Sequence, residues 1–75
     1  MNSEHLIRMA NQIGQFFESM PDRTEALEGL ATHLKKFWDP RMRREFLQLV
    51  DAASAEPPIS SMVREAVREH RGLLA

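Results

Sequence analysis

The sequence predicts a small all-α domain, a helical bundle of about four short helices, and three observations lead to that prediction. The chain has 75 residues, which is the size of one domain. Its apolar residues recur with helical spacing, and no stretch alternates between apolar and polar residues as a strand would. Its four prolines fall where the helical pattern changes phase. We therefore expect one helical domain over residues 1–75, with helices at roughly 4–19, 23–38, 40–53 and 60–71.

The first predicted helix is amphipathic and ends before Pro21. Ser3 is placed to cap its N-terminus, because a serine hydroxyl accepts a hydrogen bond from the free backbone N–H groups of a first turn. Pro21 ends the helix, because proline disfavours the helical conformation of the residue before it. With a rotation of 100° per residue, the predicted inner face covers an arc of about 120°. Ile7 lies outside this arc and is expected to be exposed. The predicted inner face comprises Leu6, Met9, Ala10, Ile13, Phe16, Phe17 and Met20.

The second predicted helix begins after Asp22 and carries a continuous apolar stripe. Asp22 and Glu25 have the spacing of a capping box, in which each side chain satisfies a backbone N–H of the other residue. Gly29 lies inside the helix and costs about 1 kcal/mol relative to alanine. We therefore expect a neighbouring backbone to approach Gly29 closely. The stripe comprises Leu27, Leu30, Ala31, Leu34, Phe37 and Trp38, with Ala26 on its shoulder.

The third and fourth predicted helices are joined by a connection rich in proline and small residues, which we expect to be the least ordered part of the chain. Asp39 followed by Pro40 is a helix start, because aspartate caps well and proline lacks the N–H that would be unpaired there. Leu47 is expected to be exposed, and Gly72 to end the last helix. The inner face of the third helix is predicted as Met42, Phe46, Leu49, Val50 and Ala53, and that of the fourth as Ile59, Met62, Val63, Ala66, Val67 and His70.

The composition excludes several classes of function. The chain has no cysteine, which excludes a disulfide framework, a thiol nucleophile and a thiolate metal site. His5, His33 and His70 have no second metal ligand at helical spacing, and the chain has neither a nucleophile motif nor a glycine-rich phosphate loop. No apolar run reaches the ~18 residues of a membrane span, and residues 1–8 lack the pattern of a signal peptide. We therefore expect a cytoplasmic, non-enzymatic chain without a metal or other cofactor.

Positive charge is concentrated at the junction of the second and third predicted helices. The formal net charge is −1, but residues 35–44 contain five basic residues and one acidic residue. Tryptophan and arginine are enriched in interface hot spots, and methionine adapts to irregular surfaces. We predict a partner-binding site at Phe37, Trp38, Asp39, Pro40, Arg41, Met42, Arg43 and Arg44, with Asn11 and Gln12 of the first helix. In the alternative interpretation the two aromatic residues belong to the core and the basic residues form an ordinary solvated surface.

Two blocks of the sequence are long and unusual. They are Met-Ala-Asn-Gln-Ile-Gly at residues 9–14 and Phe-Trp-Asp-Pro-Arg-Met-Arg at residues 37–43. Together with Pro21, His33 and Val-Arg-Glu-Ala at residues 63–66, they resemble the delta subunit of soluble NAD-dependent formate dehydrogenases. The resemblance covers nearly the whole chain.

The resemblance implies a place in a bacterial cytoplasmic complex that oxidises formate and passes the electrons to NAD. In that family the alpha subunit holds a molybdenum–pterin centre and iron–sulfur clusters, and the beta and gamma subunits carry flavin and further clusters. The delta subunit carries no redox centre. The resemblance therefore implies an accessory subunit that binds and stabilises the molybdenum-containing alpha subunit, and through it meets the beta and gamma subunits. The alternatives are a transient maturation factor that assists cofactor insertion and, disfavoured by the net charge, a small helical nucleic-acid-binding module.

Overall fold

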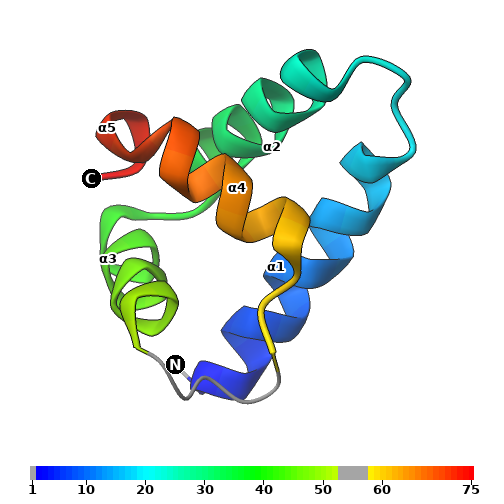
Figure 1. The fold of residues 1–75 in the computed structure, drawn as a ribbon. Helices are drawn as coiled ribbons and strands as arrows, with labels where there is room; N and C mark the ends of the chain where they lie inside the picture. The colour runs from blue at the N-terminus through cyan, green and yellow to red at the C-terminus, as the bar shows by residue number, and fades with distance from the viewer. Residues whose placement is uncertain (1, 53–57) are drawn as a thin grey trace.

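Five α-helices form the part of the chain that the computed structural model describes, residues 2–52 and 58–75, and no strand occurs in it. The predicted all-α class is confirmed. The last predicted helix is two helices instead of one, because the backbone of His70 leaves the helical region at φ −125° and ψ 30°. Gly72 consequently lies inside the short final helix and does not end the one before it. The helices are α1 (Ser3–Glu18), α2 (Arg23–Phe37), α3 (Pro40–Asp51), α4 (Ser61–Glu69) and α5 (Arg71–Leu74) (Figure 1).

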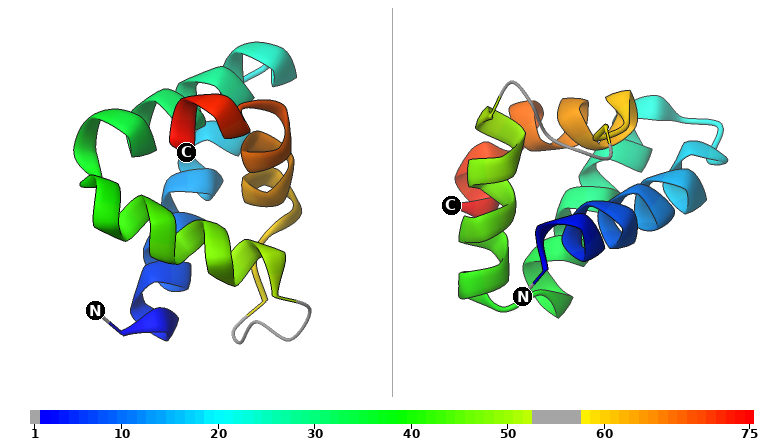
Figure 2. Two further views of the ribbon diagram at one scale, coloured as in Figure 1. Left: turned by 90° about the vertical axis from the view of Figure 1, so that its left-hand side faces the viewer. Right: turned by 90° about the horizontal axis from the view of Figure 1, so that it is seen from below.

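Helices α1 and α2 form a V that is closed by the connection at residues 19–22, and α4 lies between its two arms (Figure 1). Helix α5 packs on α2 and α4, and α3 packs on α1 (Figure 2). Every helix therefore contributes to one shared apolar core. Its largest fully buried side chains are Phe46, Leu6, Ile7, Leu30, Leu34, Met62, Val63 and Val67.

The N-terminal caps show how the sequence starts each helix. Asp22 and Asp39 cap α2 and α3 as predicted, and each carboxylate accepts a hydrogen bond from the backbone N–H three residues further on, at 3.1 and 2.9 Å. The predicted cap of α1, Ser3, is wrong. Asn2 takes that position, and its Oδ1 accepts from the N–H of His5 at 3.1 Å. Because asparagine caps a helix as well as serine does, the helix begins at Ser3.

Helix α1 buries a face that is rotated by about 70° from the predicted one, at 100° per residue. Ile7 is buried and Phe16 is 69% exposed, so the predictions for both side chains are wrong. Gly14 explains the rotation, since a Cβ atom there would lie only 2.7 Å from Cγ2 of Val63. Helix α4 therefore approaches the backbone of α1 on the side where Gly14 lies. The buried residues of α1 are Leu6, Ile7, Ala10 and Gly14.

Helix α3 is rotated from its predicted face in the same way. Leu47 is buried, which contradicts the prediction that it is exposed, and Ala53 lies outside the described residues. The side toward the core carries Arg43 at the first position of an i, i+3, i+4, i+7 pattern, where an apolar residue is usual. The rest of that pattern is Phe46, Leu47 and Val50, while Met42 and Leu49 are half-buried beside it.

Helices α2 and α4 bury their predicted faces, with two differences in α2. Phe37 is 71% exposed although it was predicted as part of the apolar stripe, whereas its neighbour Trp38 is only 5% exposed. Gly29 is approached by the ring of Phe17 and not by a backbone, since a Cβ would lie 2.8 Å from the Cε1 atom of that ring. On α4 the predicted face is buried throughout, apart from the half-buried His70.

Candidate partner-binding surface

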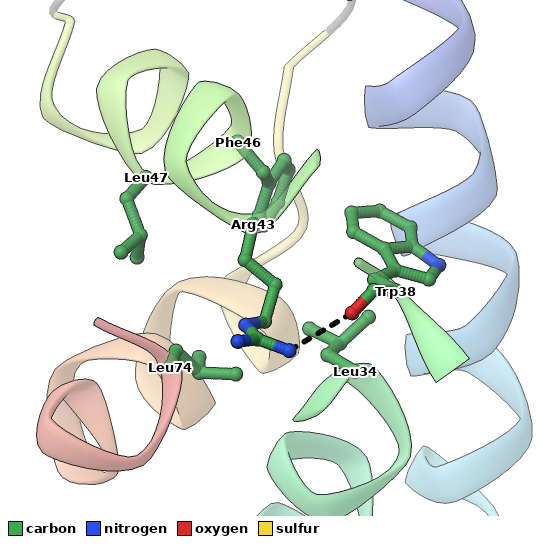
Figure 3. Close-up of a pocket in the computed structure, with 6 residues that line it drawn as sticks. All are labelled: Leu34, Trp38, Arg43, Phe46, Leu47 and Leu74. Carbon is green, nitrogen blue, oxygen red and sulfur yellow. Dashed lines mark hydrogen bonds between the residues drawn. The ribbon is translucent and has the colours of Figure 1, made fainter. Parts of the chain in front are cut away.

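The predicted site at the junction of α2 and α3 divides into a buried part and an exposed part. Trp38 is buried, as in the alternative interpretation of the sequence, and its ring meets the ring of Phe46 edge to face with centroids 5.5 Å apart. The crevice around this pair is too narrow for a water molecule (Figure 3). Trp38 therefore stabilises the domain itself. The crevice is lined by Leu34, Trp38, Arg43, Phe46, Leu47 and Leu74.

Arg43, which we expected at the partner surface, binds the end of α2. Its Nη1 atom donates hydrogen bonds to the backbone carbonyls of Lys35 and Trp38, both at 2.9 Å. Figure 3 shows the bond to Trp38. Its Nε is buried without a hydrogen-bond partner among the described residues. A cation at a helix C-terminus satisfies carbonyls that have no partner within the helix and interacts favourably with the helix dipole. Arg43 thus links α3 to α2.

The other predicted residues of the junction lie at the surface. Asp39 is occupied as the cap of α3, Pro40 is exposed in its first turn, and Met42 is half-buried. Arg41 and Arg44 are exposed. None of the five basic side chains of segment 35–44 forms an ion pair within residues 2–52 and 58–75. The exposed cations are therefore available to an acidic partner.

Asn11 and Gln12, the predicted site residues of α1, have different environments. The amide of Asn11 donates to the carbonyl of Pro58 and accepts from the N–H of Ser60, both at 3.0 Å. These two bonds connect α1 to the segment that leads into α4, so Asn11 acts in the fold. Gln12 is exposed.

An aromatic surface crosses α1 and α2, and Phe37 is the one of its four residues that we predicted as a site residue. It consists of Phe16, Phe17, His33 and Phe37, which we call the aromatic band. The ring centroids of Phe16 and Phe17 are 5.1 Å apart, those of Phe17 and His33 6.1 Å, and those of His33 and Phe37 4.7 Å. The two end rings are exposed and the two central rings are half-buried. One signal in the sequence could have indicated it, because consecutive phenylalanines point 100° apart on a helix, so one of the two lies further from the centre of the buried face.

The borders of the aromatic band carry little charge. The residues three and four positions from Phe16 are uncharged: Gln12 and Ile13 of α1, and Ser19 and Met20 directly after its end. On α2, Lys36 follows His33 by three positions and therefore borders the band at the end where Phe37 lies. The band is thus apolar along α1 and positive at the C-terminal end of α2.

The rest of the described surface carries ion pairs between helices. Arg23 of α2 pairs with Glu65 of α4. Arg71 of α5 donates two hydrogen bonds to the carboxylate of Asp51 at the end of α3, at 2.9 and 2.7 Å. These bonds hold the pKa of the Asp51 carboxyl below its ordinary value. Both pairs are exposed to solvent, so they fasten helices to one another only weakly.

In residues 2–52 and 58–75, no group of three or more histidine, aspartate and glutamate side chains converges in a way that could hold a metal ion. None of the described helices is both long enough and apolar enough to span a membrane.

Comparison with known proteins places the chain in a family. The family model of the NADH-dependent formate dehydrogenase delta subunit FdsD matches residues 5–67. Neither a curated protein nor a solved structure matches the chain. The matched region contains the aromatic band, the junction of α2 and α3, and most of α4. The chain therefore belongs to the NADH-dependent formate dehydrogenase delta subunit family.

Proposed function

We propose that this chain is a non-catalytic accessory subunit of a cytoplasmic NADH-dependent formate dehydrogenase complex, in which it binds and stabilises the molybdenum-containing alpha subunit. The observation that carries the proposal is the family match over residues 5–67. The exposure of two large aromatic rings, Phe16 and Phe37, supports a role in binding another protein, because such rings are enriched at the centres of interfaces.

The subunit acts by differential binding in this proposal. A protein that binds the assembled, cofactor-loaded form of the alpha subunit more tightly than the empty form shifts the population toward the loaded form by mass action. The chain needs no cofactor and no catalytic residue of its own for this effect. Elemental analysis of the desalted chain should therefore find no stoichiometric metal.

Affinity purification from the native host tests the proposal. The tagged chain should bring down a large molybdenum- and iron–sulfur-containing formate dehydrogenase in a constant ratio, and the purified complex should contain it when active. Removal of the chain should lower the thermal stability of the alpha subunit or its molybdenum content. Purification of the chain without any formate dehydrogenase subunit would contradict the proposal. If the chain associates only with alpha subunit that lacks molybdenum, it is not a permanent subunit. That result would favour the alternative, a transient maturation factor.

A further inference from the structure

We propose that the aromatic band is the surface on which this subunit docks, and that the matching surface of the formate dehydrogenase complex is apolar at its centre and acidic where it meets Lys36. This inference rests on the proposed function, because it names the chemistry of the partner that the proposed function requires. The proposed contact keeps Phe37 of the predicted junction and leaves out Trp38 and Arg43, which are used by the fold. It lies on the neighbouring outer face of α1 and α2.

The two end rings are held in solvent by the packing of the domain. Gly14 brings α4 against one side of α1, and this orientation turns Phe16 outward. Each exposed ring packs against a half-buried ring. The ring centroids of Phe16 and Phe17 are 5.1 Å apart, and those of Phe37 and His33 are 4.7 Å apart. Rings that are already arranged in the free protein lose little conformational freedom on binding. The band is therefore preorganised for contact.

The charges around the band indicate the kind of partner. The helical neighbours of Phe16 on α1, Gln12 and Ile13, are uncharged, and interface centres are likewise depleted of charge and enriched in aromatic residues and methionine. Lys36 borders the other end, and Arg41 lies four residues beyond Phe37, within about 14 Å along the chain. Neither cation forms an ion pair within the described residues. A protein surface with carboxylates beside an apolar centre complements this arrangement. A nucleic acid would need cations along the whole path of its phosphates.

Single substitutions at the two exposed rings test the docking surface. Full-length variants are titrated onto formate dehydrogenase complex prepared from a host that lacks this chain, and the Kd is measured. Phe16→Ala and Phe37→Ala should each raise the Kd by about tenfold or more, the scale of a hot-spot residue. Leu73→Ala is the matched control, because Leu73 is an exposed apolar side chain of α5 outside the band. It should leave the Kd unchanged. Circular dichroism and melting curves establish that the variants are folded.

Charge reversal tests the acidic border. Lys36→Glu should weaken binding several-fold at low salt and less at high salt, because salt screens exposed charges. Arg68→Glu, an exposed cation of α4, makes the same change in charge away from the band and should have little effect. If Lys36→Glu and Arg68→Glu weaken binding equally, the proposal that the partner surface is acidic beside Lys36 is wrong.

The outcomes separate the docking surface from the proposed function. If the wild-type chain binds the complex and the double variant Phe16→Ala, Phe37→Ala binds equally well, the docking surface is wrong and the proposed function stands. If the wild-type chain does not bind the complex, the proposed function itself fails. Tight binding of single-stranded RNA that the double variant loses would also overturn the proposal.

Discussion

Two edge-to-face aromatic pairs in this domain have almost the same geometry and opposite surroundings. Trp38 and Phe46 meet with ring centroids 5.5 Å apart and planes at 84°, and they are 5% and 2% exposed. Phe16 and Phe17 meet at 5.1 Å and 88°, yet Phe16 is largely in solvent. The geometry of an aromatic pair therefore does not reveal its role. The elements packed around the pair decide whether it stabilises the fold or remains available to a partner.

The neighbours of the two pairs explain the difference. The Trp38 pair lies where α2, α3 and α5 meet, and Leu74 and the stem of Arg43 close the crevice around it. The Phe16 pair lies on α1 near its C-terminal end, and α4 packs on the side where Gly14 lies. The first pair thus loses its water on folding, whereas Phe16 of the second pair keeps most of its water in the free domain and would lose it on binding another molecule.

Truncation of one ring from each pair gives the largest expected contrast. Phe46→Ala should cost about 3–5 kcal/mol of unfolding free energy, which is the cost of emptying a buried aromatic site. Phe16→Ala should change the stability by about 0.5 kcal/mol or less, as surface substitutions do. Urea unfolding followed by circular dichroism measures both values. Because a domain of this size has little stability to lose, Phe46→Leu provides a second variant that should retain a measurable transition. Equal losses of unfolding free energy in Phe16→Ala and Phe46→Ala would contradict the conclusion that Phe46 stabilises the fold and Phe16 does not.

The glycine that orients α1 should be the next most sensitive position. Gly14→Ala places a methyl group against Val63 and should cost about 1–3 kcal/mol, as overpacking a core does. Gly72→Ala is the matched control, because a Cβ there meets nothing within 4 Å. It should leave the melting temperature unchanged or raise it slightly. If Gly14→Ala were as harmless as Gly72→Ala, the close approach of α4 would not be what turns Phe16 outward.

Two arginines one residue apart should differ by a smaller amount. Arg43→Gln removes the two charged hydrogen bonds to the end of α2 and should cost about 1–2 kcal/mol. Arg44→Gln removes an exposed charge and should change stability by less than about 0.5 kcal/mol. Thermal melts of the two variants measure the difference. Similar melting temperatures would show that Arg43 does not brace the crevice around Trp38.

The smallest expected effect is a pH dependence at the exposed pair of Asp51 and Arg71. The pKa of Asp51 is lowered in the folded chain from an ordinary value of 3.8, so its contribution to stability is present above that pH and is lost as the pH falls through the folded value. The melting temperature of the wild-type chain should therefore fall slightly more below pH 4 than that of Asp51→Asn. Parallel curves for the two proteins would show that this pair contributes nothing.

Part of the candidate site could be predicted from the sequence, and the limits have physical causes. The composition of the junction predicted a partner-binding site there, but arginine has a long apolar stem and can lie either against a core or at a surface. Only the packing of α3 shows that Arg43 points inward and Arg44 outward. Asn11 was visible as a polar residue of α1, but its two partners lie 47 and 49 residues away. Contacts over such distances leave no local pattern.

The sequence by itself determined the helical class and most helix boundaries, because caps and prolines act on residues within one turn of themselves. Asp22, Asp39 and Pro40 each do so here. It also determined the inner face of α4, where all the large apolar residues lie on one side. These properties depend on residues that are close to one another in the sequence, so a pattern of a few positions is enough to predict them.

Only the tertiary structure decided which apolar residues of α1 and α3 are buried. Hydrophobic periodicity ranks the faces of a helix by the size and apolarity of its side chains, and it predicted that Phe16 is buried and Ile7 exposed. Close helix packing instead favours a face with small residues such as Gly14, because the side chain of Val63 reaches the backbone of α1 only where no Cβ intervenes. That requirement comes from the neighbouring helix α4, and it turned Phe16, one of the two largest side chains of α1, into solvent.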